Sequence, residues 1–92
     1  MRVTDLFIKR RHNAPLESVT ALWGGKDGIA GGVRTAPFRQ ALITSRSISA
    51  ELGLAPGDLR ENVVVGFDYL YNLPSGTVIK VGSALLRLTF PL

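Results

Sequence analysis

The sequence predicts a small, mostly β domain with one short helix, in which short strands curl toward a barrel. The first observation behind this prediction is that the apolar runs are only a few residues long and are separated by turns rich in glycine, proline and serine. The second is a single serine-capped segment with helical spacing at residues 45–52. With 92 residues, the chain has the length of one domain, which we expect to cover residues 1–92.

The composition describes a globular chain with an excess of positive charge. Hydrophobic residues make up 46% of the chain and its formal net charge is +4, which argues against disorder and favours an anionic partner. The chain has no cysteine and one histidine, so these residues offer no disulfide, thiolate metal ligand, cysteine nucleophile or polyhistidine site. It has no apolar run long enough to cross a bilayer and no secretory signal at its start, so we expect a cytoplasmic protein without membrane contact.

The first part of the chain is expected to form a strand pair and a glycine-rich loop. Residues 2–9 and 16–23 are the predicted strands, and Trp23 is expected to plug the core because large aromatic side chains mostly serve packing. The basic residues 9–12 indicate a solvated loop, with one rim of an anion site as the alternative. Residues 24–32 lack the ending of a phosphate-binding P-loop and are expected to form a mobile loop over a pocket.

The second part holds the predicted helix and the buried strand. Residues 39–44 read as a strand, and Ser45 is a credible N-cap for a helix over residues 46–52. Residues 63–65 are a continuous valine run and therefore predict a buried strand. The remaining segments are predicted to be extended, as an arm and two strands joined by a tight turn: residues 68–73, 77–81 and 85–89.

A polar tripeptide directly before the valine run is the most informative feature of the chain. Arg60, Glu61 and Asn62 place a cation and an amide beside a core strand, which suits an anionic or heteroaromatic ligand. The structural alternative is that Arg60 caps carbonyl groups in a turn while Asn62 bonds its own backbone. Both interpretations stay open on the sequence.

Three ordered motifs resemble those of the MOSC domain, which is named for the C-terminal part of molybdenum cofactor sulfurase. They read PGDLREN before the valine strand, then LPSGT, then VGSALL, and the similarity extends over about residues 28–89. The resemblance implies a β-barrel-like fold that binds molybdenum cofactor, a pyranopterin carrying a phosphate. It also implies sulfur transfer or molybdenum-dependent reduction. Pyridoxal phosphate would then belong to a separate sulfurase domain or to a cysteine-desulfurase-type partner.

The resemblance also implies a set of cofactor-binding residues. These are Thr44, Ser45, Arg60 and Asn62, with either Arg34 or Arg39 adding charge. No catalytic or metal-binding residue is expected, because the reactive cysteine of the family follows the final strand and this chain has none. The expectation is therefore a MOSC-like domain that is incomplete at its C-terminus and inert as a sulfur carrier.

A non-catalytic interaction domain is the alternative function. Strand edges left unpaired in an incomplete barrel would favour pairing with a second copy or with another protein. Net charge alone suggests nucleic acid, but the chain lacks the interleaved aromatic and basic residues of single-strand platforms. The expected ligand is a pterin phosphate or another small anion.

Overall fold

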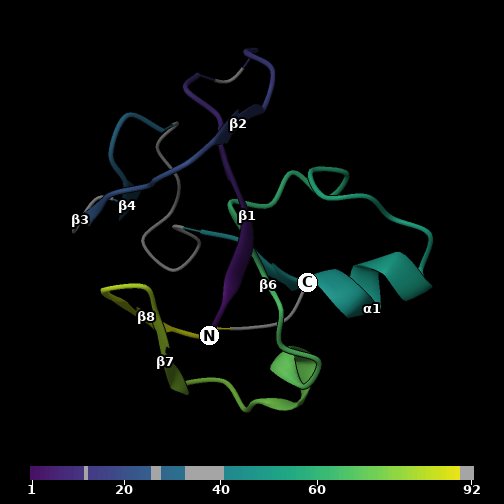
Figure 1. Cartoon of the computed structure of the whole chain (residues 1–92). Helices are drawn as coiled ribbons and strands as arrows, with labels where there is room; N and C mark the ends of the chain where they lie inside the picture. The colour runs from purple at the N-terminus through teal and green to yellow at the C-terminus, as the bar shows by residue number, and fades with distance from the viewer. Residues whose placement is uncertain (12, 26–27, 33–40, 90–92) are drawn as a thin grey trace.

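The computed structural model describes residues 1–11, 13–25, 28–32 and 41–89. These residues form three small sheets, one short α-helix and one turn of 3-10 helix (Figure 1). The predicted mostly β fold with one short helix is therefore confirmed. The described residues contain no closed barrel, and none of their helices is long and apolar enough to cross a membrane.

The largest sheet has four strands in the order β2-β1-β6-β5. β1 is antiparallel to both of its neighbours, whereas β5 and β6 are parallel. The central strand β6 is made of three valines that are all buried, as expected of a strand covered on both faces. The four strands of this sheet are β1 (Val3–Ile8), β2 (Glu17–Val19), β5 (Ile43–Ser45) and β6 (Val63–Val65).

Two hairpins and two helical segments complete the described structure. The second hairpin, β7–β8, turns through Gly82 and Ser83, and a two-residue connection suits the twist of antiparallel strands. The predicted last strands are thus present in slightly shorter form. The further elements are β3 (Gly24–Gly25), β4 (Gly28–Ile29), α1 (Arg46–Glu51), η1 (Leu70–Asn72), β7 (Val78–Val81) and β8 (Ala84–Arg87).

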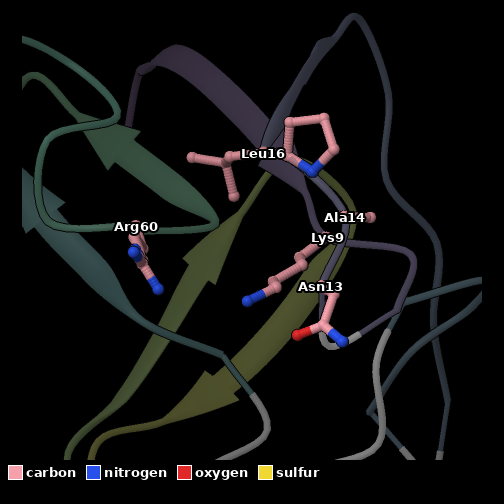
Figure 2. Close-up of a pocket in the computed structure, with 6 residues that line it drawn as sticks. Lys9, Asn13, Ala14, Leu16 and Arg60 are labelled. Atoms are coloured by element: carbon pink, nitrogen blue, oxygen red, sulfur yellow. The ribbon is translucent and has the colours of Figure 1, made fainter.

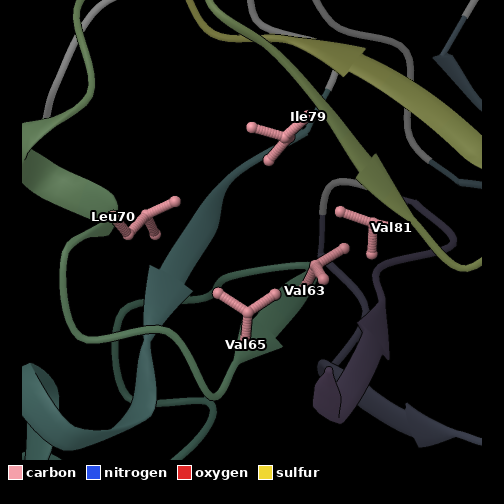
Figure 3. Close-up of a cluster of buried hydrophobic side chains, with 5 residues drawn as sticks. All are labelled: Val63, Val65, Leu70, Ile79 and Val81. Atoms are coloured by element: carbon pink, nitrogen blue, oxygen red, sulfur yellow. The ribbon is translucent and has the colours of Figure 1, made fainter. Parts of the chain in front are cut away.

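The hydrophobic core lies between β6, η1 and β7 (Figure 3). Strand β7 alternates, with two buried aliphatic residues facing β6 and two exposed residues facing outward. Leu86 and Leu88 pack against the same cluster from β8 and from the residue that follows it. The buried members are Val63, Val65, Leu70, Ile79 and Val81.

Three local predictions are wrong. Trp23 is 71% exposed rather than a core plug, because β2 ends at Val19 and short aliphatic residues from β6 and β7 fill the core. Residues 68–73 are not an extended arm, since η1 turns there and buries Leu70. The segment at 24–32 is not a loop throughout, because β3 and β4 pair within it.

Several predicted boundaries also move. The strand predicted over residues 16–23 is observed only as β2 at Glu17–Val19. The helix ends at Glu51, and Leu52 is its exposed C-cap. The strand predicted over residues 39–44 is observed as β5, displaced toward the helix, while residues 39 and 40 lie outside the described residues. Ser45 occupies the N-cap position with extended backbone angles, but its side chain makes no capping hydrogen bond.

Candidate anion-binding site

A basic hollow of about 340 Å³ lies where the β1–β2 turn meets the segment that enters β6 (Figure 2). We call it the Lys9–Arg60 hollow. Its polar side chains are two cations and one amide, and its remaining wall is apolar. The lining residues are Lys9, Asn13, Ala14, Pro15, Leu16 and Arg60.

The β1–β2 hairpin positions one side of the hollow. Lys9 directly follows Ile8, the buried last residue of β1, and the pairing of Ile8 with Glu17 fixes where the turn begins. Within the turn, the Ala14 N–H donates to the Arg11 carbonyl at 3.0 Å. The turn therefore presents Asn13 beside Lys9 on the rim of the hollow (Figure 2).

Two successive turns hold Arg60 on the other side. The Asp58 N–H donates to the Ala55 carbonyl at 3.1 Å, and the Arg60 N–H donates to the Gly57 carbonyl at 3.0 Å. The Asp58 carboxylate accepts the Ala55 N–H at 2.8 Å, which braces the first turn. These hydrogen bonds fix the backbone of both turns and thereby set the direction in which the Arg60 side chain points.

Arg60 adopts a left-handed backbone conformation. Its φ is +58°, and it is the only non-glycine residue in the described part of the chain with positive φ. Such a conformation costs an L-residue roughly 1–2 kcal/mol. Residues held this way concentrate at binding and active sites, where the surrounding structure imposes the strain. The conformation leaves Arg60 exposed while the next residue, Glu61, is buried.

Close packing under the hollow joins its two sides. Gly57 has φ of +96°, and a β-carbon placed there would lie 3.5 Å from the Phe7 ring and 3.8 Å from a methyl group of Leu16. The turn at Gly57 therefore rests directly on side chains of β1 and of the hollow. This contact keeps Arg60 near Lys9.

The two cations of the hollow have no anionic partner among the described residues. The ion pairs among the described residues lie outside the hollow and join Arg10 to Glu17 at 2.9 Å and Arg46 to Asp5 at 3.3 Å. The side chains of Lys9 and Arg60 extend into the same space, with the Asn13 amide beside them (Figure 2). A bound anion would relieve the repulsion between two like charges that share one hollow.

Both hydroxyl residues implied by the MOSC resemblance are buried and already hydrogen-bonded. The Thr44 hydroxyl donates to Glu61 Oε2 at 3.1 Å, and the Ser45 hydroxyl lies 3.3 Å from that of Ser47. The backbone N–H of Ser45 donates to the Tyr71 hydroxyl at 3.1 Å. Neither hydroxyl lines the Lys9–Arg60 hollow.

Asn62 is engaged in joining strands. Its Oδ1 accepts the Leu42 N–H at 3.1 Å and its Nδ2 donates to the Phe7 carbonyl at 3.3 Å. It therefore bonds neighbouring backbone on both sides, which is a structural role of the kind the sequence left open. Of the implied binding residues that the structure describes, Arg60 alone reaches the hollow, and Arg34 and Arg39 lie outside the described residues.

Two features were not assigned to the site from the sequence. Lys9 belongs to the basic run for which an anion-site rim was the alternative interpretation, so a signal for it was present. Asn13 carried no such signal. Glu61 is only 1% exposed, and its Oε1 has no hydrogen-bond partner in the described structure.

The donors of the hollow fit a phosphate better than they fit a whole pterin. A phosphate requires cationic and amide donors, and Lys9, Arg60 and Asn13 provide them. A pterin ring requires open donor and acceptor pairs, whereas Thr44, Ser45 and Asn62 are already bonded within the protein. The described residues contain no cluster of three or more histidine, cysteine or acidic residues that could hold a metal ion.

Comparison with known proteins adds no assignment. No family model, no curated protein and no solved structure matches the chain. Any function therefore rests on the geometry of the hollow and on the resemblance described above.

Proposed function

We propose that this domain binds a small phosphate-bearing anion in the Lys9–Arg60 hollow. The observation that supports the proposal is the meeting of two cations, without a carboxylate partner in the described structure, on one hollow of about 340 Å³. One of these cations is held in place by a strained backbone conformation. Strain at an exposed arginine whose side chain makes no hydrogen bond in the described structure favours a role in binding over a role in stability.

The side chains of the hollow have complementary roles toward such a ligand. The planar guanidinium of Arg60 can donate two parallel hydrogen bonds to phosphate oxygens, while the Lys9 ammonium supplies a compact charge. The Asn13 amide can donate to a third oxygen. Pro15 and Leu16 offer apolar surface to the organic part of the ligand.

The MOSC resemblance narrows this proposal to a pterin phosphate such as molybdenum cofactor. In that form of the proposal, the mostly β fold is a barrel-like MOSC domain in the cytoplasm. It contributes ligand binding to sulfur transfer or molybdenum-dependent reduction, and a cysteine-desulfurase-type partner supplies the thiol chemistry that this cysteine-free chain lacks. The hollow would hold the phosphate, and we assign no reaction step to the chain.

Calorimetric titration with inorganic phosphate, a phosphorylated pterin and the same pterin without phosphate tests the proposal. Arg60→Ala should weaken binding of both phosphate compounds by about 1.5–3 kcal/mol, the worth of a charged hydrogen bond. Lys80→Ala is the matched control, because it removes the same charge from the outward face of β7. If Arg60→Ala and Lys80→Ala lose the same affinity, the loss comes from the lower net charge alone, and a specific site at the hollow is refuted.

The three titrants separate the general proposal from its narrower form. If phosphate and phosphopterin bind equally well and both depend on Arg60, the hollow is a phosphate site and the pterin assignment is wrong. Phosphopterin binding much tighter than phosphate supports the narrower form. Binding of the unphosphorylated pterin alone contradicts both.

A further inference from the structure

Among the described residues, no strand pairs with the outer edge of β8. β7 is its only strand neighbour in the described part of the chain. The Leu88 N–H donates to the Thr77 carbonyl at 2.8 Å, so the alternate residues Leu85 and Arg87 direct their N–H and C=O groups away from β7. The opposite edge of the hairpin is partly covered, because the Lys80 carbonyl accepts a hydrogen bond from the terminal ammonium of Met1 at 3.0 Å.

The outward face of the β7–β8 hairpin alternates aliphatic and cationic side chains. Val78 is paired with Arg87, and Lys80 is paired with Leu85. Leu85 is 71% exposed and Val78 is 51% exposed, so this face presents two aliphatic side chains to solvent. Neither cation forms an ion pair with a described residue.

We infer that two copies of the chain pair through β8, antiparallel, about a twofold axis at Leu86. This register places Leu85 of each copy opposite Arg87 of the other, so that no like charges lie directly across from each other. The outward-directed backbone groups of each Leu85–Arg87 pair then form two hydrogen bonds. On the inner face, Leu86 meets Leu86 of the second copy and extends the apolar side that packs on the core.

Neighbouring registers are less favourable. An axis at Arg87 would place two arginines directly opposite each other, which is destabilising. An axis at Leu85 would place Arg87 opposite Ser83 in the turn and would shorten the ladder. The side-chain pattern of β8 therefore selects one register for a second copy.

The charge of the chain gives this pairing a distinctive salt dependence. Each copy carries a formal net charge of +4, so two copies repel over a distance that salt shortens. Association of two copies should therefore strengthen as salt is added. Docking of an acidic peptide on the same edge would instead weaken with salt.

Sedimentation of the full chain with two matched variants tests the inference. Both variants replace the exposed Leu85, which also lies opposite Lys80 within the hairpin, so thermal melts of both variants first check that the fold is retained. Leu85→Lys places a second cation opposite Arg87 of the other copy, whereas Leu85→Glu places a carboxylate there. We expect wild-type dissociation constants of about 10 μM to 1 mM, as for a small interface. Leu85→Lys should raise the constant at least tenfold, and Leu85→Glu should retain or strengthen pairing.

Three outcomes overturn the inference. A wild-type chain that remains monomeric at millimolar concentration has no such interface. Equal weakening in both Leu85 variants indicates non-specific apolar contact without this register. Association that weakens with salt, or that occurs only with an added acidic peptide, indicates a different occupant of the edge.

Cross-linking gives an independent reading of the register. Because the chain has no cysteine, Leu85→Cys and Arg87→Cys each carry a single thiol. Hydrogen-bonded antiparallel partners have Cα atoms about 5.5 Å apart, which suits a disulfide. A mixture of the two variants in a redox buffer should form the mixed disulfide faster than either variant forms its own. The reverse preference would exclude an axis at Leu86.

Discussion

Replacing Arg60 by glycine should stabilise the fold while removing ligand binding. The backbone at Arg60 has φ of +58°. Arginine pays roughly 1–2 kcal/mol for this conformation, and glycine does not. Glycine also makes the unfolded chain more flexible, which offsets about 0.4–1 kcal/mol of that gain. The net expectation is an increase of about 0.5–1 kcal/mol in the free energy of unfolding.

The Arg60 side chain contributes nothing that would cancel this gain. It is exposed and makes no hydrogen bond or ion pair with a described residue. Arg60→Ala retains the strained backbone and is the control, with a stability expected to lie within about 0.5 kcal/mol of wild type. For a domain of this size, the glycine variant should melt about 2–8 °C higher.

Thermal melts and phosphate titrations of the two variants together give the readout. Both variants should lose phosphate affinity to the same extent, because both remove the guanidinium. Only Arg60→Gly should gain stability. If both variants melt below wild type and retain their phosphate affinity, Arg60 is a structural cap and the binding proposal fails.

Three further substitutions test how the hollow and its surroundings are held. Gly57→Ala should lower the free energy of unfolding by about 1–2 kcal/mol in urea denaturation, because its φ is +96°; an unchanged midpoint would contradict this. Asn62→Ala should lower the free energy of unfolding by about 1–3 kcal/mol, because it leaves the Leu42 N–H without its side-chain acceptor. Phosphate affinity should not change, and a large loss of affinity would indicate that Asn62 contacts the ligand. Thr44→Val should lower the free energy of unfolding by about 1–3 kcal/mol, because Thr44 is the only donor to the buried Glu61 carboxylate among the described residues. Glu61→Gln in that background should recover part of the loss, and a neutral Thr44→Val would show that this bond is unimportant.

Several strands and turns were predictable because their signals are local. The valine run of β6 and the alternation of β7 follow directly from burial and strand period, and the β7–β8 turn follows from its glycine and serine. Trp23 and η1 were not predictable in the same way. Whether a tryptophan is buried depends on what else fills the core, and here short aliphatic residues fill it.

The candidate site was only partly predictable for a similar reason. Arg60 was identified from its residue type and neighbours. Its meeting with Lys9 and Asn13 depends on the packing of Gly57 against Phe7 and Leu16, which no sequence spacing reveals. A residue type alone also cannot tell whether a hydroxyl such as that of Thr44 is open to a ligand or bonded within the core.

The central claim is tested most directly by following backbone amide signals of the isotopically labelled protein as inorganic phosphate is added. We expect the largest saturable shifts at Lys9, Asn13 and Arg60, and we expect Arg60→Ala to abolish them. Signals of β8 should move little, which separates the hollow from a general response of the basic surface. Shifts spread evenly over exposed cations such as Lys80 and Arg87, or no saturable shift at the Lys9–Arg60 hollow, would show that the hollow is not a phosphate site.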